Sequence, residues 1–441
     1  MSDQAFLSNN GFLSDETGTC DATSIVNPCP QIDREDANAN VTCNVEDLCQ
    51  KGRSEDACDK HSSLLDVLPR VRKELIEDAQ LSPYASRASQ SRGRVLPEPE
   101  CPVRTVYERD VGRILYSMPF RRLRHKTQVF FNPQNDHICT RMEHVLYVSY
   151  LAETIGSSLG INTTLIRAIA LGHDLGHPPF GHTGESVLDR LIRERCRECD
   201  IGFQHELHSL RVIDVLSEHR DGFGLNLTFE VRDGIASHCG EKWGERCLVP
   251  YRNKGTDDLM RSALEHIMPA TLEGCVVRIC DRIAYAGRDV EDASRSGLLT
   301  FSDLPRDIVS TLGHNNQEIT NTLVRDVIRE SDGRDAIVMS DEAAEALQAL
   351  IKISVQRIYK APKAQRYERQ VSNVLEGLFE YYVDLATSGD RDDTSAAAKA
   401  FFNYQGRHPE INAAPVTVVT DYIAGMTDSY ANRMFAAIYG V

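Results

Sequence analysis

Helical spacing of apolar residues is the feature of this sequence that most restricts its fold. In residues 141–160 apolar side chains recur at steps of three and four, namely at Val145, Val148, Ala152, Ile155 and Leu159. This spacing predicts an amphipathic helix, for which Gly160 supplies a stop. A second helix is predicted from Asn162 or Thr163 as cap to Gly176, before Pro178 and Pro179. Its apolar positions place His173 on the inward side.

The same spacing continues through most of the remaining chain. It is present in residues 206–218, 268–293, 341–359, 369–386 and 419–439. The sequence contains no alternation of apolar and polar residues long enough to predict a core sheet. We therefore expect an all-α fold.

Composition is that of an ordinary globular protein, with 41% hydrophobic and 26% charged residues. No stretch approaches the roughly 18 apolar residues that a membrane span needs, so no membrane partner is expected.

The beginning, "MSDQAFLSNNGFLSDE", lacks the basic and apolar regions of a secretory signal, which predicts a cytoplasmic location. The 13 cysteines are then expected to be reduced thiols. The net charge of −16 disfavours nucleic-acid binding, and an anionic substrate would need local positive charge or a metal.

The sequence divides into three expected regions: a polar extension with a linker over residues 1–102, a core over 103–300 and a helical region over 301–441. Five cysteines lie in the first 60 residues without any CxxC pair, so a zinc module is disfavoured there and no fold is predicted. Residues 62–78 predict a short helix interrupted at Pro69. Residues 86–102 have the Ser, Gly and Pro content of a linker.

Residues 171–185, "LGHDLGHPPFGHTGE", concentrate ionisable side chains in one place, namely His173, Asp174, His177, His182 and Glu185. Neighbouring residues on a helix point about 100° apart. His173 and Asp174 can therefore bind one ion only at a helix end, or together with ligands from other helices. The glycines and prolines of this segment supply the helix end.

Two residues elsewhere can complete such a set. His144 lies in the first predicted helix, next to its apolar face, and Asp281 lies in "VVRICDRIAYAGRD". Two imidazoles and two carboxylates suit Mn²⁺, Fe²⁺ or Zn²⁺, and Mg²⁺ less well. A hydrogen-bonded core or surface residue is the alternative for any one of these histidines, but their clustering favours a site.

The predicted helix over 268–293 carries a second polar stripe. Asp281, Tyr285 and Asp289 follow one another at steps of four, so they share one face. A carboxylate, an aromatic ring and another carboxylate in a row are unusual for a core-facing stripe.

The segments "TRMEH" (140–144), "GHDLGHPPFGHTGE" (172–185) and "CDRIAYAGRD" (280–289) resemble the H…HD…D signature of the HD superfamily. They resemble most specifically the dGTPase-like deoxynucleoside triphosphate triphosphohydrolases. The segments at 116–133, 203–212 and 226–241 are also similar to that family, so the likeness covers roughly residues 104–300 and extends more weakly through the C-terminal helices. The resemblance implies a multi-helix HD-domain core with additional C-terminal helices. It also implies metal-dependent hydrolysis of dGTP or several dNTPs to deoxynucleoside and inorganic triphosphate.

Residue by residue, the resemblance places the metal ligands on His144, His173, Asp174 and Asp281, with Mn²⁺ or Mg²⁺ as the ion and Fe²⁺ or Zn²⁺ as alternatives. It places proton transfer on His182 and Glu185, which share a face if their segment is helical. It puts His177 and His205 beside the triphosphate. Glu206 stands where many relatives have Asn.

The resemblance also implies contacts to the substrate. Tyr285 would pack on the deoxyribose, where an added 2′-hydroxyl would collide, and Asp289 would accept the 3′-hydroxyl. Gln128 would help to fix sugar and base. Arg141 and Arg282 match cations that contact phosphate, a surface ion pair being the alternative for each.

Relatives form dimers, tetramers or hexamers, and several respond to dNTPs or single-stranded DNA, so the resemblance implies a homo-oligomer and effectors of these kinds. Two other functions remain open: an HD phosphodiesterase or nuclease, which the long motif and the negative charge disfavour, and a nucleotide sensor without catalysis. Cys196 and Cys199 near His205 and His208 are a weak zinc motif in a charged segment. The single tryptophan, Trp243 in "HCGEKWGERC", is interpreted as a packing residue of a loop and not as a surface on which a base stacks.

Overall fold

The computed structural model describes residues 67–128, 139–195, 202–219, 222–240, 245–295, 297–389, 393, 395–408 and 413–440. Residues 1–66 lie outside the described residues, as do Cys196, Cys199 and Trp243. Within the described part of the chain the fold is all-α, which confirms the predicted class, and strands are limited to two-residue pairs. No helix among the described residues is both long and apolar enough to cross a membrane.

The helices before the middle of the chain are α2 (Pro69–Gln80), α3 (Val106–Tyr116), α4 (Met118–Arg122), α5 (Arg141–Ser158), α6 (Thr163–Gly172), α7 (Gly181–Arg195), α8 (His205–Arg211), α9 (Phe229–Ala236) and α10 (Asp258–Glu265). Those that follow are α11 (Leu272–Arg295), α12 (Arg306–Leu312), α13 (Asn316–Ser331), α14 (Asp341–Ser354), α15 (Pro362–Ser388), α16 (Ala396–Arg407), α17 (Pro415–Ala424) and α18 (Asp428–Tyr439).

Short elements connect these helices. Single 3₁₀ turns are η2 (Ala88–Gln90), η3 (Leu123–His125) and η5 (Phe301–Asp303), and wider π turns are η4 (Val212–Leu216) and η6 (Val355–Tyr359). Strands β1 (Glu218–His219) and β2 (Gly222–Phe223) pair antiparallel, as do β3 (Cys247–Leu248) and β4 (Ile337–Val338).

Helix starts near the site are set by local capping. Thr140 and Glu143 form a capping box at the start of α5, each side chain bonding the other residue's backbone N–H. Asn162 caps α6 through two backbone N–H groups, which confirms one of its two predicted caps. Pro69 begins α2 instead of interrupting a helix, because proline needs no N–H partner in a first turn.

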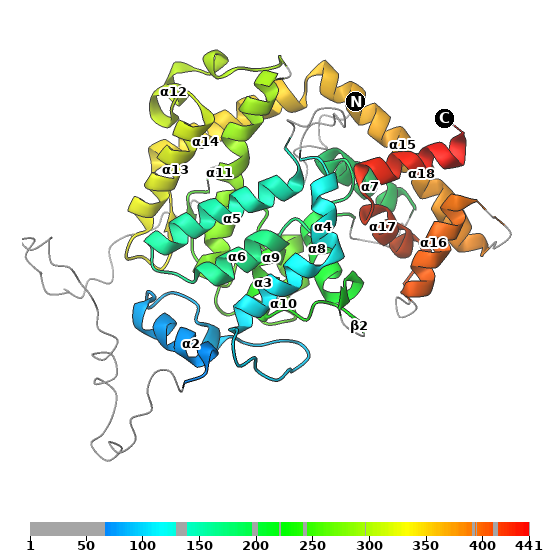
Figure 1. Ribbon diagram of the computed structural model, residues 1–441. Helices are drawn as coiled ribbons and strands as arrows, with labels where there is room; N and C mark the ends of the chain where they lie inside the picture. The colour runs from blue at the N-terminus through cyan, green and yellow to red at the C-terminus, as the bar shows by residue number, and fades with distance from the viewer. Residues whose placement is uncertain are drawn as a thin grey trace, which may run out of the picture. The chain divides into compact units, whose positions relative to one another are not determined.

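The described helices bury two hydrophobic clusters (Figure 1). The first hydrophobic cluster comes mainly from α3, α5, α6, α9, α11, α13 and α14, and α5 packs against both α6 and α11 within it. The second hydrophobic cluster comes from α7, Phe203 and helices α15 to α18. Helix α7 therefore follows α6 in sequence but packs with the C-terminal helices.

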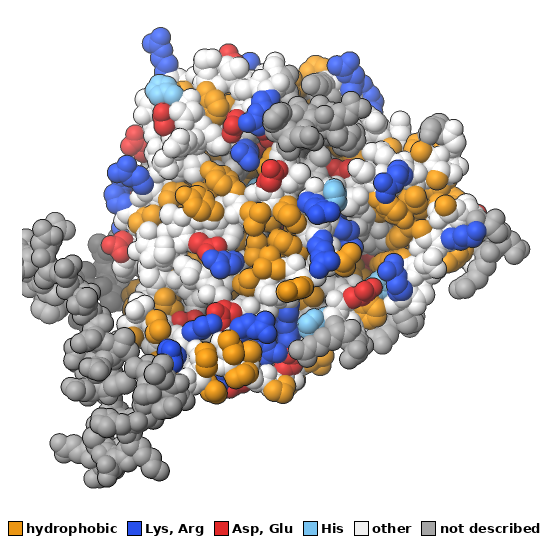
Figure 2. All heavy atoms as spheres, in the orientation of Figure 1, with side chains coloured by type: hydrophobic (Ala, Val, Ile, Leu, Met, Phe, Trp, Pro, Cys, Tyr) orange, Lys and Arg blue, Asp and Glu red, His pale blue; other side chains and the backbone are white. Residues whose placement is uncertain are grey.

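One face of the molecule carries an apolar patch among basic side chains (Figure 2). It lies over α3, α4 and α5. These helices expose Leu115, Tyr116, Met118, Leu146 and Tyr150, of which Leu115, Leu146 and Tyr150 line one hollow. Contiguous exposed apolar surface of this kind is typical of interaction surfaces.

Candidate active site

Three helices of the first hydrophobic cluster bring the expected metal ligands together. His144 comes from α5, His173 stands at the C-terminal end of α6, and Asp281 lies in the middle of α11. His144 Nε2 lies 2.8 Å from Asp281 Oδ1, and His173 Nε2 lies 3.9 Å from the same oxygen. One ligand atom from each of the three residues lies within 4.8 Å of the others.

Asp174, the residue after His173, lies beside the same ligand atoms. Its Oδ1 lies 3.6 Å from His173 Nε2 and 3.2 Å from His177 Nε2, while its Oδ2 accepts a 2.7 Å bond from Arg141 Nη1. Burial alone would raise the pKa of Asp174, but Arg141 and the two histidines hold it well below its usual range. The carboxylate is therefore ionised, as a metal ligand must be.

The orientation of His173 fits a divalent metal. Its Nδ1 contacts the Ala170 carbonyl oxygen at 2.7 Å, which commits that nitrogen as the donor and leaves Nε2 with its lone pair. Nε2 is buried and has no hydrogen-bond partner within the described residues. A buried, unpartnered imidazole nitrogen next to two carboxylates is the donor set that Mn²⁺, Fe²⁺ or Zn²⁺ prefers.

Arg141 presents unused donors beside these ligands. The side chain is fully buried, and Asp174 takes only its Nη1. Nε and Nη2 are buried without a hydrogen-bond partner in the described part of the chain, as is His177 Nδ1. A planar fork with two free N–H groups matches the geometry of a phosphate.

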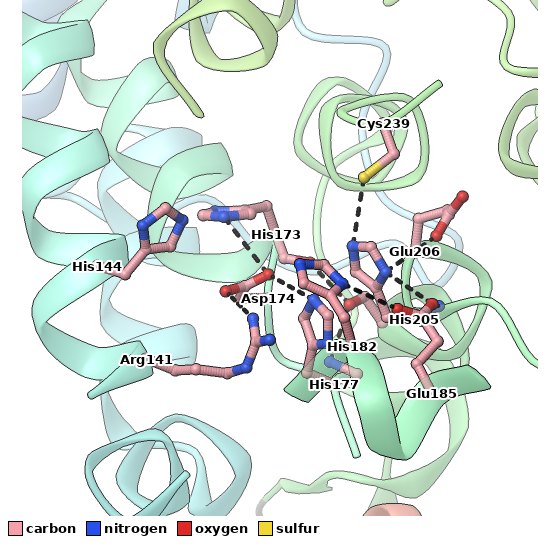
Figure 3. Close-up of polar contacts among 12 residues, drawn as sticks. Arg141, His144, His173, Asp174, His177, His182, Glu185, His205, Glu206 and Cys239 are labelled. Atoms are coloured by element: carbon pink, nitrogen blue, oxygen red, sulfur yellow. Dashed lines mark hydrogen bonds and ion pairs between the residues drawn. The ribbon is translucent and has the colours of Figure 1, made fainter. Parts of the chain in front are cut away.

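A second group of side chains stands on α7 and α8 (Figure 3). Glu185 contacts two histidines at once: its Oε2 lies 3.3 Å from His182 Nδ1, and its Oε1 lies 2.9 Å from His205 Nδ1. His182 and Glu185 are three residues apart on α7, which confirms that they share a helix face. The His205 ring stacks on the His177 ring with centroids 3.8 Å apart, so this group adjoins the metal ligands.

His205 is held in its charged form. Burial lowers its pKa, but the charges of Glu185 and Glu206 and the bond to Glu185 outweigh burial and raise the pKa to about 9. Glu206 is buried and lies 3.3 Å from His205 Nδ1, so its contribution is a negative charge beside the imidazolium.

The expected sugar contacts lie further along α11. Tyr285 is half-buried there, and Asp289 is buried and accepts a 2.6 Å bond from the hydroxyl of Tyr359 in η6. Burial raises the pKa of Asp289 to about 7. Arg282 donates to the Glu245 carbonyl oxygen at 3.1 Å.

Gln128 is brought beside α7 by a close backbone approach. A Cβ on Gly181 would lie 2.9 Å from the Gln128 carbonyl oxygen, and Gly181 has a φ of +60°, so both space and backbone conformation favour glycine there. Phe180 also has a positive φ, +67°, and its N–H donates to Asp428 Oδ1 at 2.9 Å. This contact fixes the turn that precedes His182.

Sequence reasoning missed three residues at this site. His238 and Cys239 follow α9, and the His205 ring lies next to both, with His205 Nε2 3.2 Å from His238 Nε2. Their signal was a His–Cys pair inside "NLTFEVRDGIASHCGE", a segment noticed only for its overall similarity. Tyr359 comes from a distant π turn and gave no signal.

An all-α fold that gathers two histidines, two aspartates and a buried arginine defines a class of metal-dependent phosphohydrolase. Residues 141–286 match the HD domain, and residues 337–437 match the phosphohydrolase-associated domain. The chain belongs to the family of deoxyguanosinetriphosphate triphosphohydrolase-like proteins, as its relatives show.

A protein of that name from Caldanaerobacter subterraneus is 41% identical over 83% of this chain and 94% of the relative. Those from Desulfatibacillum aliphaticivorans and Clostridium tetani are 39% and 36% identical, over 81% and 84% of this chain and 94% and 96% of the relatives.

Proposed function

We propose that this protein hydrolyses deoxynucleoside triphosphates, dGTP or several of them, to deoxynucleoside and inorganic triphosphate. The observation that carries the proposal is the position of Arg141, which bonds Asp174 and keeps two buried N–H donors without a partner among the described residues. Asp174 in turn contacts His177, which stacks on His205. Positive charge is thereby concentrated in a protein of net charge −16, as an anionic substrate requires. The names of the relatives point to the same substrate class.

In this proposal each side chain has a defined task. A divalent ion held by His144, His173, Asp174 and Asp281 would supply Lewis-acid polarisation of phosphate. Arg141 donates Nε–H and Nη2–H to phosphate oxygens, and the His205 imidazolium adds positive charge beside them.

Proton transfer falls to the pair on α7. Water attacks the α-phosphorus, the bond to the 5′-oxygen breaks, and His182 transfers a proton at that oxygen while Glu185 orients its ring. The His182 side chain is 44% exposed, which leaves its Nε2 edge accessible to substrate.

The reaction is tested by incubating the full chain with each dNTP and Mn²⁺ or Mg²⁺ and separating the products. We expect deoxynucleoside and inorganic triphosphate. Orthophosphate or pyrophosphate as the phosphorus product would overturn the assignment.

Replacing Arg141 by Lys tests the phosphate contact. We expect kcat/KM to fall about 100-fold, because a lysine can keep one bond to Asp174 but loses the two free donors of the fork. Metal content should stay at the wild-type value. Arg121→Lys, at an exposed position of α4, is the matched control and should behave as wild type. Wild-type kcat/KM in Arg141→Lys would exclude the contact.

Replacing Tyr285 by Ala tests the choice of sugar. A pocket that excludes one additional hydroxyl by collision typically changes kcat/KM by about 10²-fold. The ratio of kcat/KM for a dNTP to that for the matching ribonucleotide should therefore fall by roughly tenfold or more in Tyr285→Ala. Tyr285→Phe keeps the ring and should keep the preference. The readout is the ratio of kcat/KM for the two nucleotides, and an unchanged ratio in Tyr285→Ala would remove this role.

The homo-oligomer and the dNTP or single-stranded DNA effector remain proposals. The apolar patch over α3, α4 and α5 supports self-association. Sedimentation of the full chain tests the oligomer. Activity that appears only when two dNTPs are mixed, or on addition of single-stranded DNA, would demonstrate an effector.

A further inference from the structure

We propose that His205, His238 and Cys239 form a second metal site, adjoining the HD ligand set, which binds Zn²⁺ and stops turnover. The His238 ring lies 4.9 Å from the His173 ring, centroid to centroid. The three residues come from α8 and from the segment after α9. The binding step goes beyond the proposed function, whereas the inhibition rests on it.

The donor atoms are already spaced for a tetrahedral ion. His205 Nε2 lies 3.2 Å from His238 Nε2 and 3.3 Å from Cys239 Sγ, and the three ligand atoms lie within 4.8 Å of one another. Zinc bonds of about 2.0–2.1 Å to nitrogen and 2.3 Å to sulfur place tetrahedral ligand atoms roughly 3.3–3.7 Å apart. Two of the three separations are therefore already close to those of a tetrahedral zinc site.

Both imidazoles are oriented as zinc ligands usually are. His205 Nδ1 bonds Glu185 Oε1, and His238 Nδ1 bonds the Ile235 carbonyl oxygen at 2.7 Å. With each Nδ1 committed as donor, both Nε2 atoms turn toward the same point. Two such nitrogens in contact need a proton or a cation between them. Figure 3 shows the Cys239 sulfur directed at the same edge of the His205 ring.

The surrounding charges favour a cation overall. Glu185 and Glu206 both lie against His205. The buried Arg278 opposes a cation, but its charge is shared with Glu245 at 3.4 Å. Arg278 also donates to the Cys239 carbonyl oxygen at 2.6 Å, which fixes the backbone that carries the thiol.

The chemistry of the donors separates this site from the HD ligand set. One thiolate and two imidazoles prefer Zn²⁺, whereas Mg²⁺ and Mn²⁺ prefer carboxylate oxygens. The HD ligand set contains no sulfur, so a bond to a thiolate identifies an ion at the second site. Zinc binding releases the His205 Nε2 proton and the Cys239 thiol proton and leaves the same net charge of +1 at the site. It ties the His205 ring to His238 and Cys239 and removes its exchangeable proton, so we expect turnover to stop although the HD ion stays in place.

Cobalt spectroscopy tests the binding on the full chain. Co²⁺ bound to a thiolate gives a near-ultraviolet charge-transfer band, which the sulfur-free HD ligand set cannot give. We expect this band in wild type, its bleaching by Zn²⁺, and its loss in Cys239→Ser. Cys101→Ser, which removes a half-buried thiol in the segment before α3, is the control and should keep the band. No band in wild type, or a band that persists in Cys239→Ser, overturns the site.

Turnover tests the inhibition. With Mg²⁺ present, added Zn²⁺ should abolish dNTP hydrolysis by wild type. Cys239→Ser should reach the same inhibition only at a Zn²⁺ concentration at least about tenfold higher. Equal sensitivity of the two proteins refutes inhibition through this site. If wild type hydrolyses no dNTP, the proposed function has failed, and the cobalt band still decides whether the site exists.

Discussion

An Asp174→Asn variant is expected to lose the proposed dNTP hydrolysis by about 10³-fold or more, together with the divalent metal ion that the site is proposed to bind. Asp174 is the carboxylate that contacts His173, His177 and Arg141, so removing its charge weakens the ligand set and unpairs a fully buried guanidinium. Unpairing a buried charge costs about 3–5 kcal/mol, so thermal stability should fall as well. Turnover, metal content per chain and the melting temperature are the measurements.

Two further variants separate metal loss from unfolding. Asp307→Asn, exposed in the first turn of α12, is the matched control and should behave as wild type. His173→Ala removes a ligand but leaves the Arg141–Asp174 pair intact, and it should lose metal and turnover. Retention of stoichiometric metal and near-wild-type turnover in both site variants would exclude the ligand assignment.

A Glu185→Gln variant is expected to lower kcat by about 10²–10³, because one carboxylate orients His182 and charges His205. Although burial lowers the His205 pKa, Glu185 and Glu206 raise it to about 9. The imidazolium is therefore present below that pH and lost above it, so wild-type activity should decline as pH rises through about 9. Without the Glu185 charge the His205 pKa falls, and the decline should move to lower pH.

The pH dependence of kcat is the measurement. Glu194→Gln is the matched control, because Glu194 lies on the same helix, is exposed and contacts Arg190 at 3.4 Å. The pH dependence of kcat in this variant should match that of wild type. A Glu185→Gln profile that superimposes on that of wild type would show that the carboxylate does not control His205.

Local sequence signals predicted the parts of the fold that depend on neighbours in the chain. The apolar spacing and the Asn162 cap define α5 and α6 because capping and helix faces are set within a few residues. The segment over 419–439 showed the limit of this approach. It forms two helices, α17 and α18, which end and begin around Gly425 and Thr427.

The residues that the sequence motif assigned to the metal site lie close together in the structure, although they come from three helices. The placement of His182 and Glu185 on one helix face followed from their spacing alone. Contacts between distant elements were beyond sequence reasoning, because nothing in the local pattern records the partner. Examples are the bond from Tyr359 to Asp289, 70 residues apart, and the contact of His205 with His238. Asp428 likewise supports Phe180 from 248 residues away.

The assignment of α7 to the second hydrophobic cluster has a consequence for control of the enzyme. The helices that carry the proposed metal ligands pack in the first hydrophobic cluster, whereas His182 and Glu185 lie on a helix of the second cluster, which is built largely from α15 to α18. A perturbation confined to the C-terminal helices is therefore expected to displace His182 and Glu185 more than the proposed metal ligands. If the proposed roles hold, affinity for the metal and the rate of the chemical step can change independently of each other in this chain.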